Sequence, residues 1–237
     1  MESSSLPSTK HIICVGAVYI DTILSVPKFP IEDEKLRATH HTKRRGGNCA
    51  NTLEVLSQLI SAPSFQNGKK DNITTNLHLI TVLPNKTSLA TKFIYDTLPE
   101  ISTADSIFRA AHEEAASCYI LQNAQNHSRT IISHSPLEEM AVHEFVDSAE
   151  RLVAEAGSGV EGWYHFEGRV PGILKQCVEF LRTAPAQREF KVSVECEKPE
   201  RVGMSEVAKY ADAVFYSRIW VLVSIGLKKS TRNYLVD

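Results

Sequence analysis

The sequence predicts an α/β fold in which helices cover a mostly parallel sheet. Apolar, β-branched runs alternate with segments whose apolar residues recur at helical spacing. Strands that are separated by helices pair in parallel through right-handed crossovers. With 237 residues and 43% hydrophobic content, the chain can bury one substantial core. We therefore expect a single domain over residues 1–237.

The first predicted strand covers 11–21, an apolar run that ends in Asp21. Pro27 and Pro30 break the chain after it, and polar alternation over 35–42 predicts an exposed strand. We further expect helices over 51–60, 88–98, 142–156, 173–183 and 205–210, strands over 77–83, 163–166, 190–195 and 213–216, and a hairpin over 118–134.

The segment Gly46-Gly47-Asn48 precedes the first predicted helix and has the composition of a turn. Glycines allow positive φ and let a ligand approach the backbone closely, and Asn48 can cap the helix. Asn51 falls in the first helical turn, beside the glycines. Uncharged donors and acceptors that converge there suit a polyol or a sugar. The alternative is an ordinary capped helix after a tight turn.

Asp21 stands where a ligand site is expected if the first strand belongs to an open parallel sheet. Ligands of such sheets bind beyond the carboxyl ends of the strands. An aspartate that ends a strand is otherwise a common turn former. The glycine turn that follows in the sequence shifts the balance toward a binding role for Asp21.

Several segments, kept in order from about residue 11 to about residue 218, resemble the PfkB (ribokinase-like) carbohydrate kinases. The resemblance rests on 14–16 with Asp21, and on 29–33, 45–51, 128–131, 163–169 and 192–199. The Gly-Gly-Asn turn marks the family, and the last two segments resemble its ketohexokinase branch. The resemblance implies a three-layer α/β/α fold with a small β lid, whose strands would lie near 20–45 and 115–135.

The resemblance also implies an enzyme that transfers phosphate from ATP, with Mg²⁺, to a sugar hydroxyl such as that of fructose. In the family, the residues that match Asp21, Gly47, Asn48 and Asn51 hold the sugar hydroxyls, and the residue that matches Arg129 reaches the site from a lid strand. By its sequence context alone, Arg129 is a solvated strand charge after a hairpin turn.

The family's lid packs against its copy in a second subunit, so the resemblance implies a homodimer through the β lid. An exposed apolar face on an isolated small sheet favours such an association. That face is expected to comprise Tyr19, Ile23, Leu24, Leu36, Tyr119, Leu121, Ile131 and Ile132.

The family's catalytic motif is absent from these 237 residues. That motif, Asp-Thr-x-Gly-Ala-Gly-Asp, supplies a base and a glycine anion hole, and no Asp-x-x-Gly-x-Gly-Asp occurs here. Neither residue of the family's magnesium-arranging Asn-x-x-Glu stands at 217–220. We therefore expect a C-terminally truncated chain without a catalytic residue or metal ligand, with little capacity to bind ATP.

Three functional hypotheses follow. The first is a ketohexokinase-like sugar kinase that lacks its catalytic end. The second is a non-catalytic sugar-binding or regulatory protein. The third is a nonfunctional truncated product. An Asp-x-x-Gly-x-Gly-Asp motif in a longer transcript would favour the first hypothesis.

Charge and composition exclude several partners. The net charge is −2, from 26 basic and 28 acidic residues, and there is no basic stripe for nucleic acid or an anionic membrane. The basic run 43–45 is interpreted as a charge cluster at the lid edge.

Residues 1–9 lack the apolar core of a signal peptide and no apolar run reaches membrane-spanning length, so we expect a cytoplasmic protein. The five cysteines form no C-x-x-C pair and are expected to be reduced and structural.

Two further groups of polar residues have simple structural interpretations. His165, Glu167 and Arg169 share a face at the end of a predicted strand, and a hydrogen-bond network is favoured there over a metal site. Glu195 and Glu197 also share a face. Basic side chains nearby favour a salt-bridged edge over a catalytic pair of carboxylates.

Overall fold

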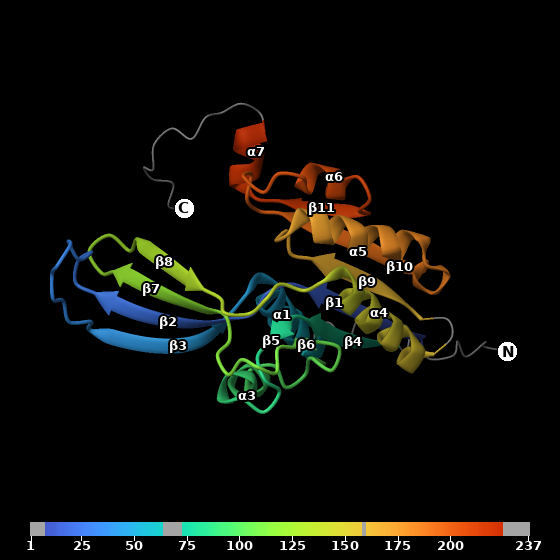
Figure 1. Ribbon diagram of the computed structural model, residues 1–237, viewed down its shortest axis with the longest axis horizontal. Coiled ribbons are helices and arrows are strands. Elements are labelled where there is room, and N and C mark those ends of the chain that lie inside the picture. The colour runs from blue at the N-terminus through green and yellow to red at the C-terminus, as the bar shows by residue number, and fades with distance from the viewer. Residues whose placement is uncertain (1–7, 64–72, 158–159, 225–237) are drawn as a thin grey trace. The chain divides into compact units, whose positions relative to one another are not determined.

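The computed structural model describes residues 8–63, 73–157 and 160–224. Its main sheet has five strands in the order β11-β10-β9-β1-β4 (Figure 1). The β1–β9, β9–β10 and β10–β11 pairs are all parallel, which confirms the predicted mostly parallel sheet. The strands are β1 (Ser8–Val15), β4 (Ile73–Ile80), β9 (Glu161–Phe166), β10 (Phe190–Cys196) and β11 (Ala213–Tyr216).

Helices carry the chain between the parallel strands (Figure 1). The first of them, α4, begins where the Glu144 carboxylate accepts a hydrogen bond from the Ala141 amide at 2.8 Å, which satisfies a donor at the helix start. Within the described residues, no helix is long and apolar enough to cross a membrane. The helices are α4 (Val142–Ala156) before β9, α5 (Pro171–Thr183) between β9 and β10, α6 (Met204–Ala208) between β10 and β11, and α7 (Arg218–Ser224) after β11.

An aromatic cluster packs α4 against the sheet. The Phe145 ring centroid lies 5.4 Å from that of Phe166 and 6.0 Å from that of Tyr164. Phe190 of β10 lies 5.0 Å from Tyr164, and all four rings are buried. The Tyr164 hydroxyl donates to Gln187 Oε1 at 3.4 Å, so the polar end of this core residue also has a partner.

The chain forms two compact units. The first comprises residues 1–15, 71–76 and 141–237, and the second comprises residues 16–70 and 77–140. Strand β4 begins in the first unit and ends in the second. The expectation of one domain for the whole chain stays a prediction.

The second unit contains a four-stranded sheet in the order β3-β2-β7-β8. β2 pairs antiparallel with β3 and parallel with β7, and β7 pairs antiparallel with β8. These strands occupy the predicted lid segments, and β7 with β8 forms the predicted hairpin. The elements of this unit are β2 (Tyr19–Val26), β3 (His40–Gly46), α1 (Asn48–Ser61), β5 (Val82–Leu83), α3 (Leu89–Asp96), β6 (Ile107–Phe108), β7 (Ser117–Asn123) and β8 (Arg129–His134).

The single strand predicted over 11–21 is wrong, because residues 16–18 separate β1 from β2. The Gly16 amide donates to the Ile80 carbonyl at 3.2 Å, beyond the last β1–β9 pair at Val15. Asp21 is therefore the third residue of β2, inside the four-stranded sheet. It does not follow the carboxyl end of a main-sheet strand, which was the reason to expect a ligand site there.

Other boundaries differ for identifiable reasons. The strand predicted over 35–42 is β3, displaced toward the C-terminus because its pairing with β2 extends until Gly46 lies opposite Tyr19. The strand predicted over 77–83 is interrupted at Thr81, whose carbonyl accepts a hydrogen bond from Ile107 of β6 at 2.9 Å. The bounds predicted for α4 and β11 are confirmed. β6 and α7 were not predicted.

The apolar residues expected on one lid face lie on two faces. Ile132 is opposite Tyr119, and the next residue, Ile131, is opposite Ile120. Because side chains alternate along a strand, Ile131 shares the face of Asp21, while Ile132 and Tyr119 point to the other face.

None of the five cysteines, all of which lie in the described residues, forms a disulfide. Four of them are buried, including Cys49 beside the glycine turn. Burial raises the pKa of the Cys177 thiol to about 12, so this thiol is not ionised at neutral pH. This agrees with the predicted packing role for these side chains.

Candidate functional site

Two glycines join β3 to α1, and each is required for a different reason. A Cβ on Gly46 would lie 2.6 Å from Asp21 Oδ1 and 2.7 Å from Oδ2, so the Asp21 carboxylate occupies the space over this glycine. Gly47 has a φ of +109°, and a Cβ there would lie 2.2 Å from the Ala17 carbonyl oxygen. The first glycine thus makes room for a side chain and the second for the backbone.

Gly47 is the N-cap of α1, and the prediction that Asn48 caps the helix is wrong. No side chain caps α1, and the Asn51 amide donates to the Gly47 carbonyl at 3.0 Å as the helix begins. Glycine adopts the non-helical cap conformation itself, so Asn48 is already the first helical residue. Its side chain is exposed at the helix start.

Asp21 is the buried anion of this region, with 7% of its surface exposed. Its partner is Arg44, whose Nε lies 3.5 Å from Oδ2 and whose own side chain is 58% exposed. An ionised carboxylate offers about four acceptor positions, so the residues that the structure describes leave most of the acceptor capacity of Asp21 unused. Burial of a charge with so few donors is unfavourable unless a ligand supplies the others.

Arg45 follows Arg44 in β3, so its side chain points to the opposite face of the sheet. It is a buried cation whose side chain is 3% exposed. Its Nη1 donates to Asn51 Oδ1 at 2.8 Å, and its Nη2 donates to the Glu54 carboxylate. Burial lowers the pKa of Arg45, while the negative charges of Glu54 and Asp21 act in the opposite direction. Arginine nevertheless stays protonated in proteins, so this is a permanent positive charge beside the glycine turn.

The structure brings four of the five predicted ligand residues to one turn. Gly47, Asn48 and Asn51 form the start of α1, and Asp21 lies over the adjoining Gly46. Arg45 links the two parts, because it bonds to Asn51 and interacts electrostatically with Asp21. That these residues bind a ligand stays a prediction.

Arg129 lies in the same sheet but apart from Asp21. It begins β8 opposite Gln122, which lies opposite Ser25 of β2, four residues after Asp21. At about 3.3 Å per residue, Arg129 is displaced by about 13 Å along the strands, as well as by two strands across the sheet. Both side chains belong to the same face, yet this structure does not bring them together.

The role of Arg45 was missed by sequence reasoning, which assigned it to a charge cluster at the lid edge. A usable signal was the spacing of Asn51 and Glu54, which lie three residues apart and therefore share one face of α1. An acceptor and an anion on the face of a helix that follows a basic strand can receive a basic side chain from that strand.

Of the network predicted for His165, Glu167 and Arg169, the structure shows the pair Arg169 Nη1 and Glu167 Oε1 at 3.9 Å, whereas His165 contacts Ser193. Trp163 Nε1 donates to Ser193 Oγ at 2.7 Å, and His165 Nδ1 lies 2.9 Å from the same oxygen. Burial lowers the pKa of His165. In the part of the chain that the structure describes, no three His, Cys, Asp or Glu side chains are placed to hold a metal ion.

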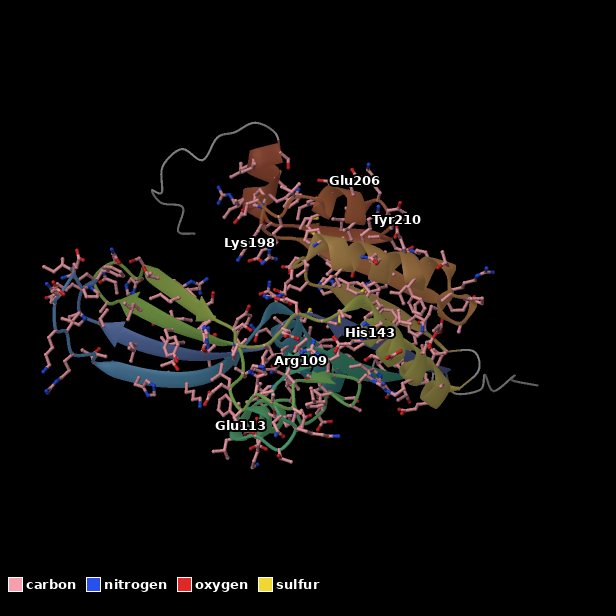
Figure 2. All side chains as sticks on the ribbon, viewed as in Figure 1. Arg109, Glu113, His143, Lys198, Glu206 and Tyr210 are labelled. Carbon is pink, nitrogen blue, oxygen red and sulfur yellow. The ribbon has the colours of Figure 1, made fainter. Side chains whose placement is uncertain are left out.

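The salt-bridged edge predicted after β10 is also confirmed. Arg201 Nη1 lies 3.8 Å from Glu197 Oε2 and donates to the Gly168 carbonyl. Lys198, labelled in Figure 2, follows β10 at the same edge. The contact with Arg201 accounts for Glu197 by structure alone.

Comparison with known proteins finds a relative in sequence and several solved structures with a similar fold. The chain is 28% identical to mouse ketohexokinase over 220 residues, which are 88% of this chain and 64% of that protein. It superposes on ribokinase from Giardia lamblia with a TM-score of 0.67 at 15% identity, covering 95% of this chain and 62% of the other. A variant of phosphofructokinase-2 from Escherichia coli gives a TM-score of 0.60 at 13% identity, covering 94% and 65%. No protein-family model matches the chain.

The chain is similar in sequence to mouse ketohexokinase and in fold to ribokinase-like carbohydrate kinases. Its α/β architecture is the ribokinase-like fold expected from the sequence. The chain spans 64% of the length of the mouse relative, so the activity, substrate and partners of a complete PfkB kinase are proposals for this chain.

PfkB kinases use ATP and generally need a metal ion. The described residues do not form a three-ligand metal site, and the 237 residues lack the family's glycine-rich anion-binding motif.

Proposed function

We propose that the second unit binds a sugar and forms the substrate-binding part of a PfkB-type carbohydrate kinase. The observation that carries this proposal is the Asp21 carboxylate, which is buried over Gly46 and has most of its acceptor positions unused by the described residues. Asn51, in the first turn of α1, adds an exposed amide. A sugar hydroxyl both donates and accepts hydrogen bonds, so it can satisfy a carboxylate and an amide together.

The similarity to mouse ketohexokinase favours a ketohexose, and D-fructose is the ligand to test first. Phosphoryl transfer requires a positioned base and donors that neutralise the developing charge. The 237 residues contain no Asp-x-x-Gly-x-Gly-Asp to supply them. We therefore propose that the chain by itself binds the sugar without phosphorylating it.

Two measurements on the 237-residue chain test the two halves of this proposal. Calorimetric titration with D-fructose is expected to show saturable binding, and an absence of binding would contradict the sugar site. A coupled assay with ATP, Mg²⁺ and D-fructose is expected to show ADP release at background. Sugar-dependent release at ordinary kinase rates would contradict the second half and leave the first intact.

A further inference from the structure

We propose that Arg45 is a positioning residue that fixes the Asn51 side-chain amide with its nitrogen available to the ligand. This inference rests on the proposed sugar site and deepens it, because it assigns a direction to the hydrogen bonds that the site can make.

The chemistry of the two side chains determines the orientation. A guanidinium has five N–H donors and no acceptor, so the Asn51 atom that lies 2.8 Å from Arg45 Nη1 must be the carbonyl oxygen. The reverse orientation would place two donors against each other. The amide nitrogen, Nδ2, then carries two donors and makes no hydrogen bond with the residues that the structure describes.

Arg45 is itself held in place. Its second nitrogen, Nη2, donates to the Glu54 carboxylate, and its side chain is almost completely buried. The planar fork of the guanidinium lets one side chain engage Asn51 and Glu54 at once, which the point charge of a lysine does not reproduce. Arg45 Nε is buried without a partner among the described residues, so the two terminal nitrogens make the specific contacts.

The result is a site with a fixed donor and a fixed acceptor. The Asp21 carboxylate can only accept hydrogen bonds, and the exposed end of Asn51 can only donate. A ligand must therefore present a hydroxyl proton to Asp21 and an oxygen lone pair to Asn51. A neutral polyhydroxy compound meets both requirements, whereas an ammonium group facing Asn51 has no lone pair and would be repelled by Arg45.

The first test needs no ligand. Relaxation of the ¹⁵N-labelled Asn51 side-chain NH₂ group, assigned by its loss in Asn51→Ala, reports the order of that amide. We expect a rigid amide in the wild type and an order parameter below about 0.6 in Arg45→Met. An unchanged order parameter in Arg45→Met would overturn the proposal.

Control variants keep this first test decisive. Lys92→Met removes an exposed cation that pairs with Asp96 on α3, and it should leave the Asn51 amide rigid. If Arg45→Met does not fold, as judged by thermal denaturation, Arg45→Lys replaces it. A lysine ammonium is a point charge on a flexible stem and lacks the planar fork that engages Asn51 and Glu54 at once, so the amide should again lose order, and a fully rigid amide would contradict the role of the guanidinium.

The second test is a double-mutant cycle on D-fructose affinity. Arg45→Met should weaken binding by about fivefold, the usual effect of having to order one more polar side chain on binding. In an Asn51→Ala background, the same substitution should cause no further loss. Additive losses would show that Arg45 acts independently of Asn51. If the wild type does not bind D-fructose, the proposed function fails, and the relaxation measurement alone decides the role of Arg45.

Discussion

Asp21 is a residue whose burial opposes folding and favours binding. Among the described residues, the cation within ion-pair distance is the exposed Arg44, whose Nε lies 3.5 Å from Oδ2, and Arg45 adds a longer-range interaction. A buried charge of this kind destabilises the folded chain until a ligand supplies the missing donors. Stability and affinity should therefore respond in opposite directions when the charge is removed.

Asp21→Asn tests this opposition. The variant should unfold at the same temperature as the wild type or higher, and its affinity for D-fructose should fall about tenfold or more, because a hydrogen bond to a charged group contributes about 1.5–3 kcal/mol. Calorimetry and thermal denaturation give the two quantities. Asp96→Asn, at an exposed carboxylate on α3, should change neither. Equal affinity in wild type and Asp21→Asn would remove Asp21 from the site.

The two turn glycines should fail in different ways when they are replaced by alanine. Gly46→Ala places a methyl group against the Asp21 carboxylate, whereas Gly47→Ala meets the Ala17 carbonyl and an unfavourable φ, with a strain of about 1–3 kcal/mol or more. Urea unfolding should show that Asp21→Ala restores the stability of Gly46→Ala. The same second substitution should not restore Gly47→Ala, and equal rescue of both variants would contradict this account.

Residue patterns predicted the glycine turn and the position of Asn51 in the first turn of the helix, because both are local features of the sequence. The contact of Asn51 with Arg45 was not predictable in the same way, since it depends on how the end of β3 meets the first turns of α1. Asp21 was selected for a reason that the fold does not support. It lies within β2 of the four-stranded sheet, and its burial over Gly46 is what makes it a candidate.

Among the elements, β11 is attached to β10 through Asp212. Its carboxylate accepts hydrogen bonds from the Val192 amide at 2.7 Å and from Arg182 Nη2 at 2.6 Å, and its own amide donates to the Val192 carbonyl. Burial opposes ionisation of this carboxyl group, but the two donors prevail and lower the pKa of Asp212 below its ordinary value. The strand at the edge of the main sheet is therefore secured by a charged side chain.

A lowered pKa in the folded state gives a definite pH dependence. The stabilisation is present above the ordinary carboxyl pKa and is lost as the pH falls through the folded-state value, that is, below about pH 4. Asp212→Asn should lose about 1–2 kcal/mol at neutral pH, allowing for partial solvent exposure, and should depend less on pH in that acid range. Chemical denaturation at several pH values measures both effects. Parallel pH profiles for wild type and variant would contradict the assignment.

Elements with strong helical periodicity or β-branched runs were placed well, as the confirmed bounds of α4 and β11 show. The division between β1 and β2 was not, because the apolar run continues through Gly16 without a change in hydrophobicity. Only the hydrogen bond of Gly16 to Ile80, a residue far along the chain, marks the break.

For the molecule as a whole, the four-stranded sheet suggests a way to assemble. Asp21 and Ile131 share one face, which the proposed ligand needs. Tyr119 and Ile132 are cross-strand neighbours on the other face, and they are 51% and 61% exposed. Association through this second face would cover apolar surface and leave the Asp21 face open.

We therefore expect a homodimer through the face of Tyr119 and Ile132. Light scattering should give the mass of two chains for the wild type and of one chain for Ile132→Glu, in which a buried charge would oppose association. Ile131→Glu is the matched control, since the neighbouring residue is 49% exposed on the opposite face and should leave the dimer intact. A monodisperse wild-type monomer, or a monomer produced by Ile131→Glu alone, would contradict this arrangement.

The different neighbours of Gly46 and Gly47 lead to an expectation about descent. Gly46 is confined to glycine by the side chain of Asp21, whereas Gly47 is confined by the main chain at Ala17, which every substitution at that position retains. In a relative without aspartate at position 21, residues other than glycine become possible at position 46, whereas position 47 still requires glycine. Positions 21 and 46 should therefore covary among relatives. A residue other than glycine at position 46 should mark a relative that no longer binds the ligand.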